Sequence, residues 1–269
     1  MKLLSGKKIA DKMLKDLKEK IREEKLIPRL AVILIGSDEA SQIYVSLKGK
    51  AAKKVGISFL RIDLRDDIAE NEVLKEIDKL NKDEKISGII VQLPLPAHLD
   101  KNRVIQSISP QKDVDGFSLQ KTFPPVFPYA LLELLKSAGK DLKNKNAIIL
   151  CNSQEFGGVM QWILEEEGMA AQYVFRFQIP ERLDDIKNAD VLISACGQKN
   201  LISRDIIKEG VVIIDGGIVR VDGKVRGDVD NESLKSFPGH LSPVPGGVGP
   251  VTIACLLRNV YLAAKKVLN

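Results

Sequence analysis

A tyrosine and a lysine stand four residues apart at Tyr44 and Lys48, in a segment whose pattern predicts a helix. Side chains at this spacing project from one face of a helix, so the phenol and the amine would lie beside each other. An amine in a cleft can have its pKa lowered toward neutrality and can then exchange protons with a bound substrate. The alternative is an exposed pair on a solvated helix face, and the spacing alone favours that alternative.

Two more polar side chains follow segments that end where a ligand could bind. Gln92 closes a strand expected at 86–92 and precedes Leu93-Pro94, where the backbone leaves the sheet and can aim an amide into a crevice. Asp115 stands in the turn-like sequence Asp-Val-Asp-Gly at 113–116. The alternatives are a strand-end glutamine bonded to a loop and a carboxylate that caps its own turn.

A loop rich in glycine and proline spans 243–252, with the sequence Pro-Val-Pro-Gly-Gly-Val-Gly-Pro-Val-Thr, ahead of an apolar helical run expected at 253–267. Glycines let a ligand approach the backbone, prolines stiffen the loop, and a helix start presents unpaired N–H groups to electron-rich ligands. The alternative is a turn before a C-terminal helix.

These residues need elements that position them, and apolar periodicity supplies the expected elements. In the first part of the chain it predicts helices at 9–21, 41–55 and 71–81 and strands at 30–35, 57–64 and 86–92. Alternating helices and short buried strands are typical of parallel α/β architecture.

A second α/β part begins with a strand at 146–150, followed by a loop at 151–158 and a helix at 159–167. Further strands are expected at 171–175, 191–195 and 211–215. This progression is Rossmann-like, and ligands are expected at the carboxyl ends of its strands.

The composition excludes several classes of function. The chain has 269 residues and a formal net charge of +5, spread as mixed lysine and glutamate along helices, so no nucleic-acid partner is expected. It shows no apolar stretch of the roughly 20 residues that cross a bilayer, and we expect no membrane partner and a cytoplasmic location. Three cysteines and two histidines without ligand spacing predict neither a disulfide framework nor a metal site.

Several motifs in a fixed order resemble the bifunctional methylenetetrahydrofolate dehydrogenase/cyclohydrolase family. They are the segments 44–48, 88–96, 112–116, 215–218, 227–229 and 243–252. The resemblance covers essentially the whole chain. It implies an α/β fold of two lobes: an N-terminal three-layer parallel α/β domain and a C-terminal Rossmann-like dinucleotide-binding domain. The expected division is 1–120 with 250–269 for the folate-binding domain and 121–249 for the nucleotide domain, with the C-terminal helix returning to the first lobe.

The resemblance also implies roles for individual residues. Lys48 matches the family's catalytic lysine, Tyr44 the tyrosine that stacks on the folate ring, Gln92 a residue that tunes Lys48, and Asp115 the partner of the pterin's amino-pyrimidine edge. Further implied substrate-binding residues are Val91, Leu93, Pro245, Gly246, Gly247, Val248 and Gly249. The implied reaction oxidises methylenetetrahydrofolate with NADP or NAD and hydrolyses the methenyl product to 10-formyltetrahydrofolate, in a homodimer.

The expected nucleotide-binding residues are Cys151, Asn152, Ser153, Gln178 and Ile218. Here the chain departs from the family pattern Gly-Arg-Ser-x-x-Val-Gly-x-Pro, because Cys151, Asn152 and Val159 replace its glycine, arginine and proline. Asn152 cannot replace an arginine as the partner of a 2′-phosphate, and the Cys151 side chain is expected to narrow the approach to a pyrophosphate. A cyclohydrolase without dehydrogenase activity and a non-catalytic folate-binding paralogue therefore remain as alternatives.

Overall fold

The computed structural model describes residues 1–267 as two compact units. One unit, here called the three-stranded unit, comprises Asp11–Val126 and the segment from Ile253. The other, called the six-stranded unit, comprises Met1–Ala10 and Phe127–Thr252. The expected α/β fold with two lobes is confirmed, and the C-terminal helix does return to the first lobe.

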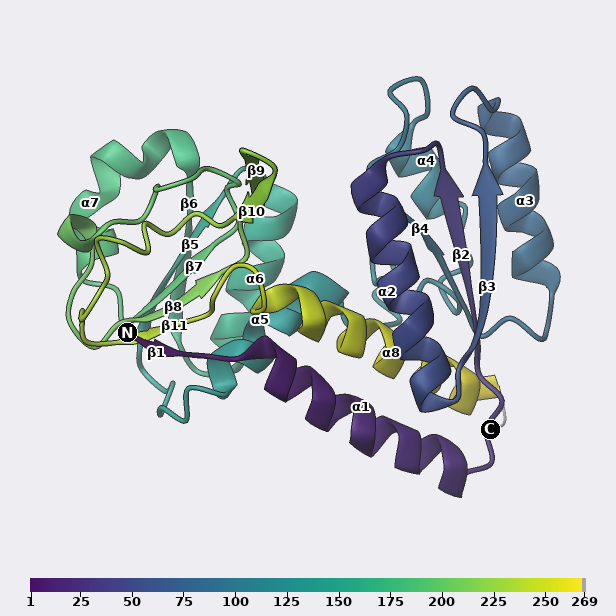
Figure 1. The fold of residues 1–269 in the computed structure, drawn as a ribbon, viewed down its shortest axis with the longest axis horizontal. Coiled ribbons are helices and arrows are strands. Elements are labelled where there is room, and N and C mark those ends of the chain that lie inside the picture. Colours follow the sequence, from purple (N-terminus) through teal and green to yellow (C-terminus); the bar gives the residue numbers. More distant parts are fainter. Residues whose placement is uncertain (268–269) are drawn as a thin grey trace. The chain divides into compact units, whose positions relative to one another are not determined.

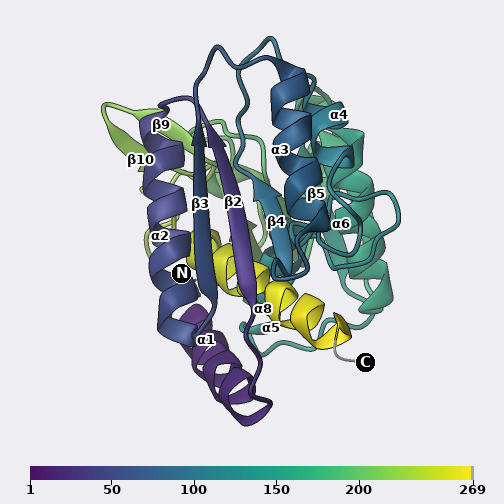
Figure 2. The ribbon, with the colours of Figure 1, turned by 90° about the vertical axis from the view of Figure 1, so that its right-hand side faces the viewer.

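The three-stranded unit has a parallel sheet of order β3-β2-β4 (Figures 1 and 2). Its strands are β2 (Arg29–Ile35), β3 (Ser58–Leu64) and β4 (Gly88–Val91), and its helices include α2 (Glu39–Val55), α3 (Glu70–Lys82) and α4 (Lys101–Gln106). Alternate side chains of β2 and β4 pack with α3 and α4 in one apolar cluster, whereas α2 contacts β2 and β3. Alternate residues of a strand face opposite sides of a sheet. The sheet therefore forms the middle of the three expected layers, with α3 and α4 on one side and α2 on the other.

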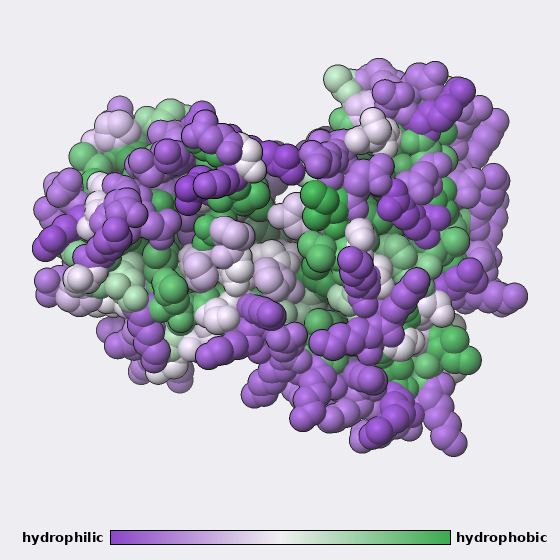
Figure 3. All heavy atoms as spheres, in the orientation of Figure 1, coloured by the Kyte–Doolittle hydropathy of each residue, from purple (hydrophilic) through white to green (hydrophobic). Residues whose placement is uncertain are grey.

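Helix α3 is amphipathic, with an apolar face toward the sheet and a polar face toward solvent. Its buried residues Val73, Ile77 and Leu80 follow helical spacing, and hydrophilic side chains cover the rest, as the right side of Figure 3 shows.

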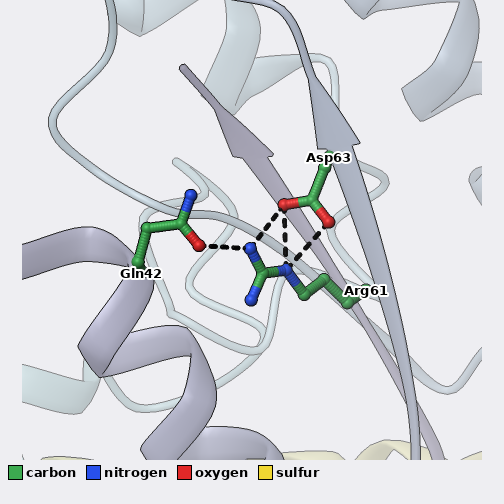
Figure 4. A network of polar contacts seen from close by, with 3 residues as sticks. All are labelled: Gln42, Arg61 and Asp63. Atoms are coloured by element: carbon green, nitrogen blue, oxygen red, sulfur yellow. Dashed lines mark hydrogen bonds and ion pairs between the residues drawn. The ribbon is translucent and has the colours of Figure 1, made fainter. Parts of the chain in front are cut away.

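Strand β3 is an edge of the sheet, and charged side chains occupy its exposed positions. Arg61 donates to both carboxylate oxygens of Asp63, two positions along the strand, and to Gln42 Oε1 on α2 (Figure 4). Charges on an edge strand discourage pairing with another chain. The bond to Gln42 also fixes the first turns of α2 against the sheet.

The six-stranded unit has strand order β1-β11-β8-β7-β5-β6, and all of its pairings are parallel. The strands are β1 (Lys2–Leu3), β5 (Asn146–Cys151), β6 (Ala170–Phe175), β7 (Val191–Ser194), β8 (Val212–Asp215) and β11 (His240–Leu241). Helix α6 (Gln154–Glu166) packs on β5 and β6, and α7 (Leu183–Lys187) joins the apolar cluster on the other face. A separate antiparallel hairpin is formed by β9 (Val219–Val221) and β10 (Lys224–Arg226).

The remaining helices each contain a boundary between the two units. They are α1 (Gly6–Glu23), α5 (Val126–Lys136) and α8 (Val248–Val267), and two short 3₁₀ turns lie at Arg176–Arg182 and Arg204–Ile206. No helix in the described part of the chain is long and apolar enough to span a bilayer.

Several boundaries differ from those expected. Residues 1–10 belong to the six-stranded unit because β1 pairs with β11 there. Helix α6 begins at Gln154 rather than 159, because Ser153 caps it and the following glycines are helical rather than loop. Helix α8 begins at Val248 rather than 253, because the first turn of a helix tolerates Pro250 without losing a hydrogen bond.

Candidate active site

Lys48 and Gln92 meet in the three-stranded unit. Helix α2 carries Lys48, and its start is fixed by Asp38, whose side chain accepts from the Ser41 N–H at 2.8 Å. Lys48 Nζ donates to Gln92 Oε1 at 2.9 Å. Two residues far apart in the sequence are thus brought into one polar arrangement, as the resemblance to the family implied.

Gln92 is held in a single orientation by its position just after β4. Its backbone N–H donates to the Ile33 carbonyl at 2.8 Å, which extends the pairing with β2 by one residue. Its side-chain Nε2 donates to the Leu93 carbonyl at 2.6 Å. Because the amide nitrogen is engaged there, the amide oxygen faces Lys48.

Asp115 lies in a turn that two neighbouring residues build. Asp113 is 2% exposed and accepts the N–H groups of Gly116 and Ser118, which closes the turn. Lys112 Nζ donates to the carbonyls of Leu80, Asn81 and Asp83 at the end of α3. These supporting roles were not predicted from the sequence, although the motif 112–116 contains both residues.

The charges of Lys48 and Asp115 influence each other. Burial lowers the pKa of Lys48, and the negative charge of Asp115 acts in the opposite direction. Burial raises the pKa of Asp115, and the positive charge of Lys48 opposes that shift. The site therefore holds an amine that loses its proton more readily than an ordinary lysine.

Other expected substrate residues lie in both units. Tyr44 is half-buried one helical turn before Lys48, Val91 is buried at the end of β4, and Leu93 is half-buried beyond it. The loop Pro245–Gly249 belongs to the six-stranded unit, where Pro245 and Gly246 are exposed and Gly247 and Val248 are buried. The three-stranded unit thus holds Tyr44, Lys48, Gln92 and Asp115, and the glycine-rich loop belongs to the six-stranded unit.

The residues expected to bind a nucleotide all follow strands of the six-stranded sheet. Residues 151–153 end β5 and start α6, Gln178 follows β6, and Ile218 follows β8. Because these strands are parallel, their carboxyl ends meet at one edge of the sheet. Ile218 is 54% exposed, and Gln178 accepts the Phe175 N–H with its side chain.

Cys151 does not face solvent at the start of α6. Its side chain is fully buried, and its sulfur fills the space beside Gly157, where an added Cβ would lie 2.9 Å from Sγ. The thiol therefore points into the protein beneath the first turn of α6. A pyrophosphate could still approach the start of α6, whose first N–H groups have no partner within the helix.

Asn152 bridges two neighbouring strands. Its Nδ2 donates to the Cys196 carbonyl at 2.8 Å, beyond the end of β7. Cys196 itself is buried, and burial together with the charge of Asp228 raises the pKa of its thiol to about 12. That thiol stays protonated at neutral pH, which excludes it as a nucleophile.

The two units and the edge of the six-stranded sheet define an α/β protein with a lysine-containing site in one unit and a dinucleotide-type fold in the other. Family models match residues 4–115 as the tetrahydrofolate dehydrogenase/cyclohydrolase catalytic domain and residues 125–268 as the NAD(P)-binding domain of the same family.

Relatives along the whole chain agree with this match. The bifunctional protein FolD of Staphylococcus haemolyticus is 40% identical over 277 residues, which is 98% of this chain and 97% of the relative. A FolD crystal structure from Campylobacter jejuni superposes with a TM-score of 0.93, is 39% identical and covers 99% of both chains. The Trypanosoma brucei FolD, solved with NADP and an inhibitor, has a TM-score of 0.91 and 29% identity over 99% of this chain and 98% of that one. The chain belongs to the tetrahydrofolate dehydrogenase/cyclohydrolase family.

Proposed function

We propose that this chain oxidises methylenetetrahydrofolate to methenyltetrahydrofolate with a nicotinamide nucleotide and hydrolyses that product to 10-formyltetrahydrofolate. The observation that carries this proposal is the arrangement of Lys48, Gln92 and Asp115 in one unit. A desolvated amine held by an amide suits a reaction that needs proton transfer near neutral pH. Family membership supplies the substrate class.

Lys48 moves protons in the hydrolytic step. Water attacks the methenyl carbon, and its proton passes to Lys48 Nζ, which the lowered pKa leaves neutral more often than an ordinary lysine amine. The protonated amine gives that proton to the folate nitrogen that leaves as its bond to carbon breaks. The hydroxyl on the carbon releases its own proton to solvent as it becomes a carbonyl, and the carbon remains as a formyl group on the other nitrogen. Gln92 Oε1 keeps Nζ in place through both transfers.

Asp115 and Tyr44 bind and orient the folate. A carboxylate accepts two parallel hydrogen bonds from an amino-pyrimidine edge, which selects for planar partners of this type. Tyr44, one turn before Lys48, offers an aromatic face for stacking on the pterin. Pro245, Gly246, Gly247, Val248 and Gly249, together with Val91 and Leu93, complete the proposed substrate contacts.

The nucleotide binds at the carboxyl edge of the six-stranded sheet. The residues present fit a pyrophosphate, because Ser153 caps α6 and the Cys151 side chain is buried against Gly157 rather than exposed. A bound nicotinamide would accept the hydride in the oxidation. Cys151, Asn152, Ser153, Gln178 and Ile218 are the proposed contacts, and none of them offers the positive charge that a 2′-phosphate prefers.

A second candidate function is a cyclohydrolase without useful dehydrogenase activity. It is favoured by Asn152, which stands in place of the family's arginine and has its amide engaged by the Cys196 carbonyl. We also propose a homodimer in the cytoplasm.

Two rate measurements on the purified protein test these proposals. Hydrolysis of methenyltetrahydrofolate is followed by absorbance, and oxidation of methylenetetrahydrofolate is followed separately with NAD and with NADP. Both reactions are expected. Hydrolysis without oxidation would establish the second candidate, and folate binding without either reaction would overturn the proposal.

A further inference from the structure

Two buried aspartates in the six-stranded unit have no role in the proposed reaction. Asp215 ends β8 and Asp228 follows the β9–β10 hairpin, and they are 2% and 0% exposed. Buried carboxylates are costly unless they are hydrogen-bonded, so their partners indicate what they do.

Asp228 holds the segment that follows β7. One of its oxygens accepts from the Ser194 hydroxyl and from the Cys196 N–H at 2.8 Å, and the other accepts from the Gln198 N–H at 2.7 Å. Three groups within five residues are thus bound to a single carboxylate. The course of Ser194–Gln198 depends on that side chain.

Asp215 holds Asp228 in turn. Its Oδ1 accepts the N–H groups of Gly217 and Asp228 at 3.0 and 3.1 Å, and its Oδ2 accepts the Val229 N–H at 3.1 Å. The backbone on which Asp228 stands is therefore bound to the end of β8.

Two glycines make room for this pair of carboxylates. A Cβ at Gly217 would lie 2.1 Å from Asp228 Oδ1, and a Cβ at Gly227 would lie 2.1 Å from Asp215 Oδ2. No side chain fits at either position while the carboxylates stay in place. The motifs 215–218 and 227–229 thus form one interlocked structure.

The held segment lies where an open α/β sheet binds its ligands. Successive strands pass from β5 to β6 on one side and then to β7 on the other, so the direction of strand order reverses between β5 and β7. Ligands bind in the crevice outside the carboxyl ends of the strands at such a point. The bond from Asn152 to the Cys196 carbonyl joins the two sides of this point, and Asp228 binds the N–H of the same Cys196.

We propose that Asp228 is a positioning residue for the nucleotide site and acts through the segment Ser194–Gln198. It fixes the β7 side of the crevice, so that the backbone groups of this segment are in place before the nucleotide arrives. Preorganised backbone reduces the entropy lost on binding. This inference rests on the proposed nucleotide-dependent oxidation.

The test is the affinity of Asp228→Asn for NAD and NADP, measured by calorimetry, with hydrogen exchange of residues 194–198 as a second readout. The substitution keeps the shape of the side chain but replaces one acceptor with a donor that faces N–H groups. We expect at least a tenfold increase in the nucleotide dissociation constant and faster exchange of the Cys196 and Gln198 amides. In steady-state oxidation the nucleotide KM should rise more than kcat falls.

Ile186→Ala is the control, because it removes a buried side chain of α7 from the core of the same unit and leaves every hydrogen-bonding group of residues 194–198 in place. Gly217→Ala should reproduce the effect of Asp228→Asn, since its methyl displaces the carboxylate. Should Asp228→Asn fail to fold, Ser194→Ala removes only the hydroxyl donor, and a smaller increase in the same dissociation constant is expected.

The outcomes separate this inference from the function it rests on. Nucleotide affinity in the Asp228 or Ser194 variant that falls no further than in the Ile186 variant would overturn the positioning role alone. A wild-type protein that binds neither nucleotide would overturn both the oxidation and the positioning role.

Discussion

Two effects act on the pKa of Lys48 in opposite directions, and burial is the larger. The lost hydration of the ammonium group lowers its pKa, and the carboxylate of Asp115 only partly restores the charged form. Gln92 contributes an amide oxygen, which orients the amine but adds no full charge. The position and the pKa of Lys48 are therefore set by different neighbours.

Replacing Lys48 with methionine should abolish hydrolysis of methenyltetrahydrofolate while folate analogues still bind. Methionine keeps the apolar length of the side chain and removes the amine, and loss of a proton-transfer group costs about 10²- to 10⁴-fold in rate. The rate is measured at saturating substrate and the affinity by calorimetry. Lys50→Met, an exposed position on the same helix, is the control and should behave as wild type. Wild-type hydrolysis by Lys48→Met would rule out the proposed role.

Replacing Asp115 with alanine should weaken folate binding by roughly 1.5–3 kcal/mol, because it removes a charged hydrogen-bond partner of the pterin edge. The pH profile of hydrolysis gives a second readout in Asp115→Asn. Loss of the negative charge lowers the pKa of Lys48 further, so the pH at which the neutral amine becomes available should move down. Unchanged folate affinity in the alanine variant would mean that Asp115 has only a structural role in the turn at 113–116.

Asn152 bears on the choice of nucleotide. A 2′-phosphate carries close to two negative charges at neutral pH, and an amide already bonded to the Cys196 carbonyl cannot balance them. Titration with each nucleotide, alone and with a folate analogue, should show NADP binding no better than NAD. Micromolar NADP affinity with clear discrimination against NAD would contradict this expectation. It would point instead to Arg176, which is exposed just beyond β6.

Helix α6 shows how a single element depends on contacts beyond its own sequence. Ser153 caps its first turn, and Gly157 lies against the Cys151 sulfur and the ring of Tyr173. The start of this helix sets the backbone N–H groups that face the proposed pyrophosphate. The adjacent glycines of α6 differ in the space around them, because Gly157 is crowded and Gly158 is open. They can therefore serve as a test position and its matched control.

Gly157→Ala and Gly158→Ala should change stability in opposite directions. A Cβ at Gly157 would lie 2.8 Å from the Tyr173 ring, and over-packing of this kind costs about 1–3 kcal/mol. Gly158 has open space around its Cα, so alanine there should gain about 1 kcal/mol from helix propensity. Urea denaturation measures both. A Gly157 variant as stable as the Gly158 variant would show that the first turn of α6 is free to shift.

Across the whole molecule, the chain passes between the two units at three places, after Ala10, Val126 and Thr252. The three-stranded unit is therefore complete only when its last segment, beyond Thr252, has been added. Asn259 of that segment donates to the carbonyls of Val114 and Pro124, both at 2.9 Å, and so joins the C-terminal helix to the chain around the Asp115 turn.

Asn259→Ala should destabilise the three-stranded unit by about 1–3 kcal/mol, because two carbonyls lose their donor in a buried place. Hydrogen exchange should accelerate in 112–126 and stay unchanged in the sheet of the six-stranded unit. Thr252→Val, which removes only a local bond to the Gly249 carbonyl, is the control. Equal acceleration in both units would mean that they unfold as one.

The sequence by itself determined the elements with strong apolar periodicity and the residues that local motifs mark. The strands and helices that flank Lys48 and Gln92 were predicted within a few residues, because alternating and helical burial are written into each segment. The two-lobed α/β class and the family followed from motifs in order along the chain. The contact between Lys48 and Gln92 was implied only by the resemblance to the family, because local patterns alone favoured an exposed lysine and a glutamine bonded to its own loop.

Only the tertiary structure decided features that depend on distant neighbours. The two-residue strands β1 and β11 have too little sequence to show a period, and their pairing is set by the sheet they complete. The inward direction of the Cys151 thiol depends on space left by Gly157, and the partners of Asp228 come from a strand end more than thirty residues away. Sterics and buried hydrogen bonds of this kind arise from residues that the fold brings together, so a linear pattern does not contain them.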